Sequence, residues 1–85
     1  MKKVLMFHLS TCPYCHAALA WIKELKEEHP ELQKVDIQMI EEREQPEIAE
    51  QYDYYYVPTL YVDGVKVHEG AATKEKMHEA LKKAL

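Results

Sequence analysis

The sequence predicts an α/β fold: a four-stranded mixed sheet in the order β-α-β-α-β-β-α, with helices on both faces of the sheet. An apolar run at residues 3–8, a helical pattern and an alternating run form a βαβ unit, whose two strands must be parallel. Near the C-terminus, two strand patterns are joined by Asp63-Gly64, which is a signal for a tight antiparallel hairpin. We expect residues 1–85 to form a single domain, because 85 residues supply only one core.

The first half of the chain supplies the βαβ unit. Residues 3–8 are almost continuously apolar, which is typical of a central strand buried on both faces. A helix is expected from Pro13 to His29, where Pro30 ends the pattern. Its apolar face is formed by Cys15, Leu19, Ile22 and Leu25. Apolar and polar residues alternate over residues 35–39, which predicts an edge strand with one solvent-facing side.

The second half supplies a helix, a hairpin and a last helix. A helix begins near Gln45, with a proline in its first turn, and is expected to end near Asp53. Residues 59–62 and 65–68 are the two strands of the hairpin. Thr73 is a candidate N-cap for the last helix. The apolar residues of that helix recur at helical spacing, namely Met77, Leu81, Ala84 and Leu85.

Charge and composition exclude several classes of partner. The chain carries 11 basic and 15 acidic residues, a net charge of −4, so there is no excess of positive charge to meet the phosphates of a nucleic acid. The longest apolar stretch, Val4 to Phe7, is far too short to span a bilayer. The N-terminus shows neither the apolar core nor the cleavage site of a signal peptide. We therefore expect a monomeric cytoplasmic protein without nucleic-acid or membrane partners.

The candidate active site is the segment Cys12-Pro13-Tyr14-Cys15, which holds the only two cysteines of the chain. The spacing allows a disulfide to form within one turn, and the helix start stabilises a thiolate at Cys12 through its dipole. Cys12 is expected to be the exposed nucleophile and Cys15 the buried resolving thiol. Pro13 fits the first helical position, where no N–H is needed. Tyr14 lies beside the exposed sulfur, where it could contact a substrate or simply cover the sheet edge.

Two metal-binding functions remain as alternatives to redox chemistry for the two cysteines. A structural zinc site normally needs four ligands, and this chain has no second cysteine pair, so histidines would have to converge on the two thiolates. A second alternative is an iron–sulfur cluster held between two copies of the chain, which the stiff Pro13 disfavours. We expect no metal ligands and no bound cofactor, and we predict thiol–disulfide exchange.

Val57-Pro58-Thr59 is the second candidate element of the site. A proline directly before a strand, in a chain that also carries a C-x-x-C motif, suggests a cis peptide bond packed against the cysteine loop. An extended backbone at Val57 would then offer its N–H and C=O to a substrate chain, as an added strand. An aromatic cluster of Tyr52, Tyr54, Tyr55 and Tyr56 precedes it, which could fill the core between the second helix and the third strand or form a rim for protein docking. At least one of Tyr54 to Tyr56 is expected to be exposed near the site.

These motifs resemble the thioredoxin superfamily, and the glutaredoxins most of all. Ser10 to Cys15 is similar to the dithiol glutaredoxin active site, and Val57 to Gly64 is similar to the cis-proline strand and hairpin of both glutaredoxins and thioredoxins. The resemblance covers essentially the whole chain. It implies a thioredoxin fold and a disulfide oxidoreductase in which Cys12 attacks, Cys15 resolves and Pro58 is the cis proline beside them. Pro13, Tyr14, Val57, Pro58 and Thr59 would then contact substrate.

The sequence also departs from both families, which leaves the electron source open. Glutaredoxins often place a lysine where this chain has Leu9, and a Gly-Gly element where it has only Gly70, and both features bind glutathione. Thioredoxins usually bury an acidic residue at the position of Met6. We therefore expect disulfide-containing proteins as substrates. The co-substrate is either glutathione or a flavoprotein of the thioredoxin-reductase type.

Two polar features near the site are interpreted as structural and are given no role in the chemistry. The charge run from Glu41 to Glu44 is expected to be a solvated loop that leads into the second helix. His16, which directly follows the resolving cysteine, is expected to point to solvent from the first helical turn.

Overall fold

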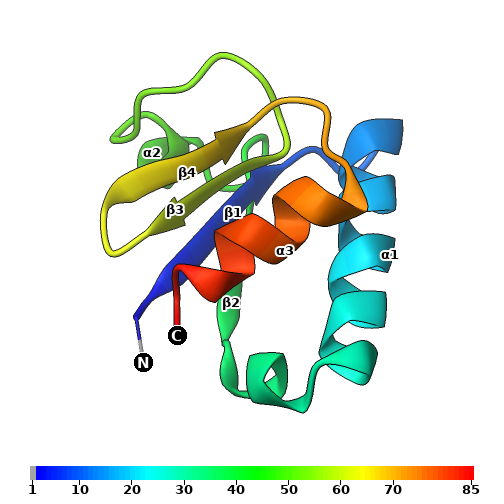
Figure 1. Ribbon diagram of the computed structural model, residues 1–85. Coiled ribbons are helices and arrows are strands. Elements are labelled where there is room, and N and C mark those ends of the chain that lie inside the picture. The colour runs from blue at the N-terminus through cyan, green and yellow to red at the C-terminus, as the bar shows by residue number, and fades with distance from the viewer. Residues whose placement is uncertain (1) are drawn as a thin grey trace.

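The computed structural model describes residues 2–85 and contains the predicted elements in the predicted order (Figure 1). The elements are β1 (Val4–His8), α1 (Pro13–Glu28), the 3-10 helix η1 (Pro30–Lys34), β2 (Ile37–Glu41), α2 (Pro46–Ala49), β3 (Thr59–Val62), β4 (Val65–Glu69) and α3 (Lys74–Lys82). Only η1 is additional to the predicted set. None of the helices in residues 2–85 is long and apolar enough to cross a membrane.

The four strands form one mixed sheet in the order β2-β1-β3-β4. β1 pairs in parallel with β2, as the βαβ unit requires, and antiparallel with β3. β3 and β4 form the predicted hairpin, with an irregular register between Leu60 and Tyr61. The hairpin turn uses Asp63 at φ 48° and Gly64 at φ 81°, so the sequence signal for positive φ is confirmed. β2 and β4 are the edge strands.

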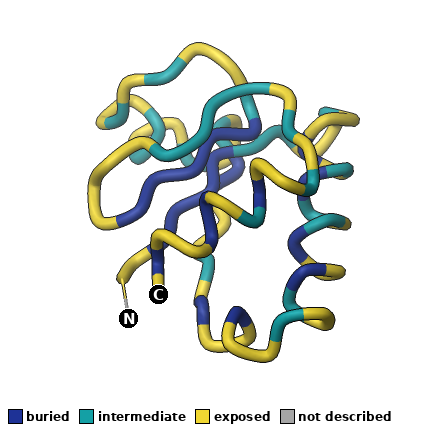
Figure 2. Tube along the Cα trace, in the orientation of Figure 1, coloured by how far each residue is buried: buried dark blue, intermediate teal, exposed yellow. Residues whose placement is uncertain are grey.

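The central strand divides the core into two layers. Val4 and Met6 pack with α1 and α3 on one face, whereas Leu5 and Phe7 pack with residues of α2 and the following tyrosines on the other. Buried residues run through the middle of the sheet, and exposed residues lie on the outer turns (Figure 2). This arrangement confirms that helices cover both faces, and it explains why β1 is apolar at successive positions rather than at alternate ones.

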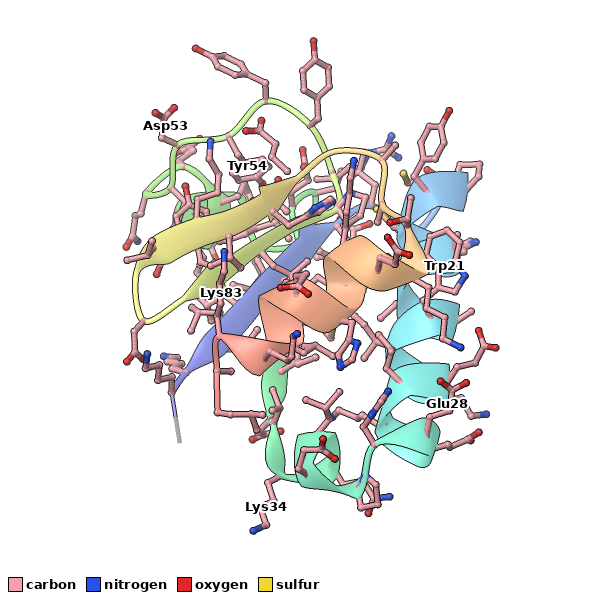
Figure 3. The ribbon with its side chains drawn as sticks, in the orientation of Figure 1. Trp21, Glu28, Lys34, Asp53, Tyr54 and Lys83 are labelled. Carbon is pink, nitrogen blue, oxygen red and sulfur yellow. The ribbon has the colours of Figure 1, made fainter. Side chains whose placement is uncertain are left out.

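The long helix and the last helix follow their sequence signals closely. In α1 the buried residues are Cys15, Ala18, Ile22 and Leu25, and Leu19 is only half-buried. The helix ends at Glu28, two residues before the proline that opens η1. Thr73 is the N-cap of α3, where its hydroxyl accepts the N–H of Lys76 at 3.1 Å. Lys74 of α3 donates to Glu28 of α1 at 2.6 Å and links the two helices. Glu28 extends from the later part of α1 (Figure 3).

Two predicted boundaries are wrong, for local reasons. β2 covers residues 37–41 rather than 35–39, because η1 continues to Lys34 and the N–H of Val35 still bonds to Leu32 O at 3.0 Å. The strand consequently includes Glu41, which lies in the predicted solvated charge run but is buried. α2 is only four residues long, because the chain after Ala49 forms turns with hydrogen bonds to the third preceding residue.

Candidate active site

The candidate site lies where β1 ends and α1 begins. The loop of residues 9–12 connects these two elements, with the N–H of Cys12 bonded to Leu9 O at 3.1 Å. Phe7 is paired with Thr59, so the residues preceding β3 lie at the same end of the sheet as this loop. The sheet therefore brings the two candidate segments, Cys12–Cys15 and Val57–Thr59, to one edge of the molecule.

Cys12 and Cys15 occupy the predicted positions at the helix start. Cys12 is the N-cap of α1, and its carbonyl oxygen accepts the N–H groups of Cys15 and His16, both at 3.1 Å. Its side chain is half-buried rather than freely exposed, whereas Cys15 has no exposed surface at all. Both cysteines are free thiols, one helical turn apart. Of the two cysteines, Cys12 alone has exposed surface.

The environment of Cys15 keeps its thiol protonated. Burial is the largest cause that raises the pKa of Cys15 from 9.0 to about 12, and a backbone hydrogen bond from Leu9 opposes it. A hydrogen bond to the Cys12 sulfur, the charge of Cys12 and the charge of Glu42 raise the pKa further. Two of these causes depend on Cys12 itself, so the acidity of Cys15 depends on the chemical state of its neighbour.

Pro13 and Tyr14 form the outer surface beside the sulfurs. Pro13 is the first residue of α1 and is exposed, as expected of a proline at that position. Tyr14 is 60% exposed. Its ring therefore does not cover the sheet, and it is free to contact a molecule that approaches Cys12.

The peptide bond between Val57 and Pro58 is cis, as the sequence suggested. Pro58 is fully buried and its carbonyl accepts the N–H of Gly70 at 2.9 Å. The hydroxyl of the buried Thr59 donates to Tyr56 O and so holds the preceding loop from within. Within residues 2–85, the N–H and C=O of Val57 take part in no hydrogen bond. These two groups remain free to pair with another chain.

The tyrosines before Val57 divide between core and surface. Tyr54 is half-buried and its ring centroid lies 4.9 Å from that of Phe7, whereas Tyr55 is 86% and Tyr56 is 70% exposed. Glu69 of β4 accepts the backbone N–H groups of Tyr55 at 2.5 Å and of Tyr56 at 3.1 Å. The prediction of exposed rings in this segment is confirmed.

Glu69 also accepts the ammonium of Lys66 at 2.7 Å. Together with the two backbone N–H groups, this ion pair lowers the pKa of Glu69 to about 2. The carboxylate is therefore ionised at any pH near neutral, and it can hold the tyrosine loop throughout that range.

Glu41 is a member of the site that the sequence did not reveal. Its carboxylate accepts the N–H of Ser10, in the cysteine loop, at 2.9 Å and the N–H of Arg43 at 2.6 Å. These backbone hydrogen bonds lower its pKa to about 2. The interpretation of residues 41–44 as a solvated run is therefore wrong for Glu41. The available signal was its place at the carboxyl end of a parallel strand, where functional groups of α/β sheets gather.

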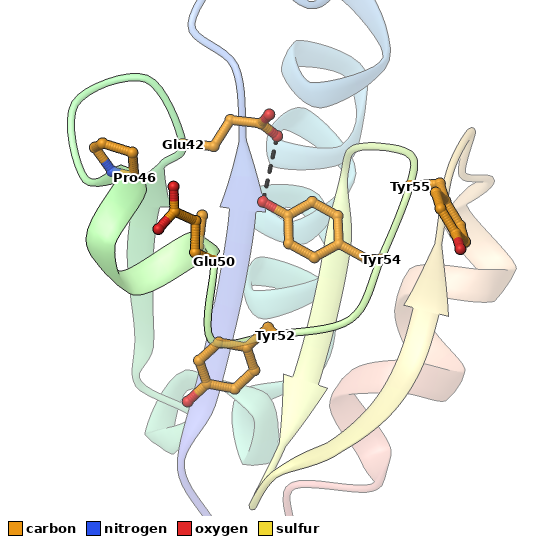
Figure 4. Close-up of a pocket in the computed structure, with 7 residues that line it drawn as sticks. Glu42, Pro46, Glu50, Tyr52, Tyr54 and Tyr55 are labelled. Atoms are coloured by element: carbon orange, nitrogen blue, oxygen red, sulfur yellow. Dashed lines mark hydrogen bonds between the residues drawn. The ribbon is translucent and has the colours of Figure 1, made fainter.

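An open groove of about 370 Å³ lies on the α2 side of the sheet (Figure 4). Its lining residues are Glu42, Pro46, Ala49, Glu50, Tyr52, Tyr54 and Tyr55. The hydroxyl of Tyr54 donates to Glu42 at 3.3 Å, and burial raises the pKa of Tyr54 above its usual value. The groove contains neither cysteine, so it is not where the thiol chemistry takes place.

His16 is exposed, as expected, but its ring is not free in solvent. Nε2 lies 2.6 Å from Ser10 O, so this nitrogen must carry a proton and donate it to the carbonyl. Among residues 2–85, no group of three or more His, Cys, Asp or Glu side chains is arranged to hold a metal ion.

Comparison with known proteins identifies the family. Residues 2–82 match the family described as the thioredoxin domain. The chain belongs to the thioredoxin family. A thioredoxin of Methanocaldococcus jannaschii is 36% identical over 83 residues, covering 98% of this chain and 95% of the relative. A probable thioredoxin of Methanothermobacter thermautotrophicus is 33% identical over 76 residues, covering 89% of this chain and 87% of the relative.

Solved structures show the same thioredoxin fold. A Fasciola hepatica thioredoxin superposes with a TM-score of 0.71 at 22% identity, over 99% of this chain and 81% of the other. A structure described as a malarial protein gives a TM-score of 0.74 at 13% identity, over 100% of this chain and 98% of the other. The thioredoxin fold and the resemblance to this superfamily are thus confirmed. The chain is a disulfide oxidoreductase of the thioredoxin family.

Proposed function

We propose that this thioredoxin-family chain reduces disulfide bonds in other proteins, by cycling Cys12 and Cys15 between the dithiol and the disulfide. The observation that carries the proposal is the pair itself: a half-buried cysteine at the start of α1 and a fully buried cysteine one turn later. Such an arrangement gives the two thiols different roles, because only one of them can meet a substrate.

In the first step, the thiolate of Cys12 attacks one sulfur of the substrate disulfide. A Cys12–substrate disulfide forms, the substrate S–S bond breaks, and the departing substrate sulfur leaves as a thiolate that takes a proton from solvent. Cys12 is the N-cap of α1, and the N-terminus of a helix favours a nearby negative charge.

In the second step, Cys15 loses its proton to solvent and attacks the Cys12 sulfur of the mixed disulfide. The Cys12–substrate bond breaks, the second substrate sulfur leaves as a thiolate that takes a proton from solvent, and the Cys12–Cys15 disulfide forms, so two electrons have passed to the substrate. Cys12 no longer carries a negative charge or accepts a hydrogen bond at this stage. Two of the causes that raise the pKa of Cys15 are then absent, and the resolving thiol becomes more acidic when it must react.

The substrate chain is proposed to lie along Val57, with its backbone paired to the free N–H and C=O of that residue. Tyr14 and Pro13 would contact it from the cysteine side, because both are exposed beside Cys12. Pro58 and Thr59 are buried, so their contribution is to fix the backbone that presents Val57.

Two sources could return the electrons, and each has an observation in its favour. The thioredoxin names of the relatives support a flavoprotein of the thioredoxin-reductase type. The Cys-Pro-Tyr-Cys segment, which resembles that of glutaredoxins, supports glutathione as the reducing co-substrate. We propose the flavoprotein as the main source, and a monomer acting in the cytoplasm.

The test compares the two routes with matched cysteine variants. Wild type, Cys12→Ser and Cys15→Ser are assayed for reduction of a protein disulfide with a thioredoxin reductase, and for reduction of a small glutathione mixed disulfide with glutathione. We expect wild type to work in the first assay and both variants to fail there. Activity of Cys15→Ser with glutathione would instead indicate a glutathione-linked enzyme.

The same samples test the metal-binding alternatives. Metal analysis and an absorption spectrum of the wild type as purified would reveal stoichiometric zinc or an iron–sulfur cluster. Inactivity of the wild type in both assays, together with bound metal, would overturn the oxidoreductase proposal.

A further inference from the structure

Two glutamates on opposite edge strands each hold one loop of the site by its backbone. Glu41 ends β2 and bonds to the loop that carries Cys12, whereas Glu69 ends β4 and bonds to the loop that leads to Val57. Neither carboxylate belongs to the sequence motifs of the site, and each accepts two backbone N–H groups. Each loop is thus held from a different outer strand of the sheet, the cysteine loop from β2 and the tyrosine loop from β4.

The cysteine loop depends on Glu41 through the backbone of Leu9 and Ser10. The N–H of Ser10 donates to Glu41 at 2.9 Å, and the carbonyl of Leu9, in the same peptide group, accepts the N–H of Cys12 at 3.1 Å. The C=O of Ser10 accepts from His16 at 2.6 Å, and Leu9 also supplies the backbone hydrogen bond to the Cys15 sulfur. The backbone that Glu41 holds therefore contacts both cysteines.

The Glu41 carboxylate is buried, so the hydrogen bonds that it accepts must compensate for lost contact with water. The residue is 9% exposed, and a buried carboxylate is costly unless its oxygens accept hydrogen bonds. Both of its oxygens do so, one from the cysteine loop and one from the turn after β2. The carboxylate thus joins the end of β2 to the loop between β1 and α1.

The tyrosine loop depends on Glu69 in the same way. The carboxylate holds the adjacent N–H groups of Tyr55 and Tyr56 and is itself anchored by Lys66 at 2.7 Å. Both tyrosine rings are directed outward, at 86% and 70% exposure, directly before Val57. The contact fixes the backbone of the segment that a substrate would meet, and it leaves the rings at the surface.

We propose that Glu41 and Glu69 are positioning residues with separate effects: Glu41 sets the reactivity of Cys12, and Glu69 sets the fit of the protein substrate. The proposal rests on the proposed function and names two residues that control it. The effects separate because β2 and β4 are the two outer strands of the sheet and each glutamate bonds to a different loop. Distant sites without shared partners act additively.

The test uses charge-neutral variants of both residues and of a matched control. Glu41→Gln leaves one oxygen acceptor but turns an amide NH₂ toward the other N–H, and Glu41→Ala removes both acceptors. Glu69→Gln is the equivalent change at the second loop. Glu44→Gln is the control, because it removes the same charge from an exposed side chain three residues after Glu41.

Three measurements are made on each variant: the rate of Cys12 alkylation as a function of pH, the kinetics with a small aromatic disulfide, and the kinetics with a protein disulfide. For Glu41→Ala we expect alkylation at pH 7 and kcat/KM for both substrates to fall about tenfold, with Glu41→Gln in between. For Glu69→Gln we expect KM for the protein disulfide to rise about tenfold, with alkylation and the small disulfide unchanged. Glu44→Gln should match the wild type.

Thermal unfolding is measured alongside, and all rates are taken well below each melting temperature, so that a merely structural loss is separated from positioning. If Glu41→Gln and Glu41→Ala show the wild-type alkylation profile, Glu41 does not position Cys12. If Glu69→Gln affects both substrates equally, the second half of the proposal is wrong. A wild type that fails to reduce protein disulfides would refute the proposed function, while the alkylation profiles would still decide the role of Glu41.

Discussion

Alkylation of Cys15 gives a quantitative test of the environment described for the buried thiol. A pKa of about 12 instead of 9.0 lowers the thiolate fraction near neutral pH about 10³-fold. A thiolate of higher pKa is intrinsically more reactive, by about 20-fold for this difference. Ionisation alone should therefore slow Cys15 about 50-fold in the folded protein relative to the unfolded chain, and the absence of exposed surface slows it further.

The assay uses less than one equivalent of iodoacetamide at pH 8, with a small free thiol as internal standard. Fragment-ion mass spectrometry assigns each singly modified molecule to Cys12 or Cys15, in folded protein and in urea. In a Cys12→Ser variant, Cys15 should react faster than in wild type but slower than in urea, because burial, the largest cause, remains. If folded and unfolded Cys15 react at rates within about threefold of each other, the argument from burial fails.

Three further predictions concern the free energy of unfolding, each measured by urea unfolding. Phe7→Ala should lower it by about 3–5 kcal/mol, because the ring is fully buried among three tyrosines. The control Val65→Ala, at an exposed position, should change it by no more than about 0.5 kcal/mol, and equal losses in the two variants would contradict the prediction. Thr73→Ala should cost about 1 kcal/mol through the lost cap of α3, and an unchanged midpoint would mean that the cap contributes nothing. The pKa of Glu41 is about 2 in the folded protein, against an ordinary value of 4.5, so its contribution to stability is complete above pH 4.5 and is lost as the pH falls toward 2. In Glu41→Gln, the free energy of unfolding should therefore fall less steeply with decreasing pH than in the wild type. Parallel plots of stability against pH for the two proteins would disprove this.

The sequence was sufficient for the fold because its strongest signals are local. The apolar run of β1, the proline after α1 and the Asp63-Gly64 turn each determine one element, and the βαβ rule then determines the parallel pair. The position of the cysteine pair was equally predictable, because the residues beside it mark the start of a helix. Local signals placed these features within a residue or two.

The features that the sequence did not reveal depend on contacts between distant segments. Glu41 bonds to Ser10 across 31 positions, and Glu69 bonds to Tyr55 across 14, so no local pattern marks either carboxylate. Glu41 was also missed because the predicted bounds of β2 were wrong and left this residue outside the strand. A charge run at the end of a parallel strand is better interpreted with the strand than with the loop that follows.

The irregular register between Leu60 and Tyr61 has a consequence for self-association. An outer strand presents unpaired backbone groups along one side, and a flat one invites edge-to-edge aggregation. In β4 the bulge opposite Leu60 and Tyr61 disturbs the regular ladder, and the charged pair Lys66 and Glu69 lies on the same strand. Extended chains are therefore discouraged from adding to this side of the sheet. The substrate contact that we propose at Val57 is thus kept apart from the outer side of β4.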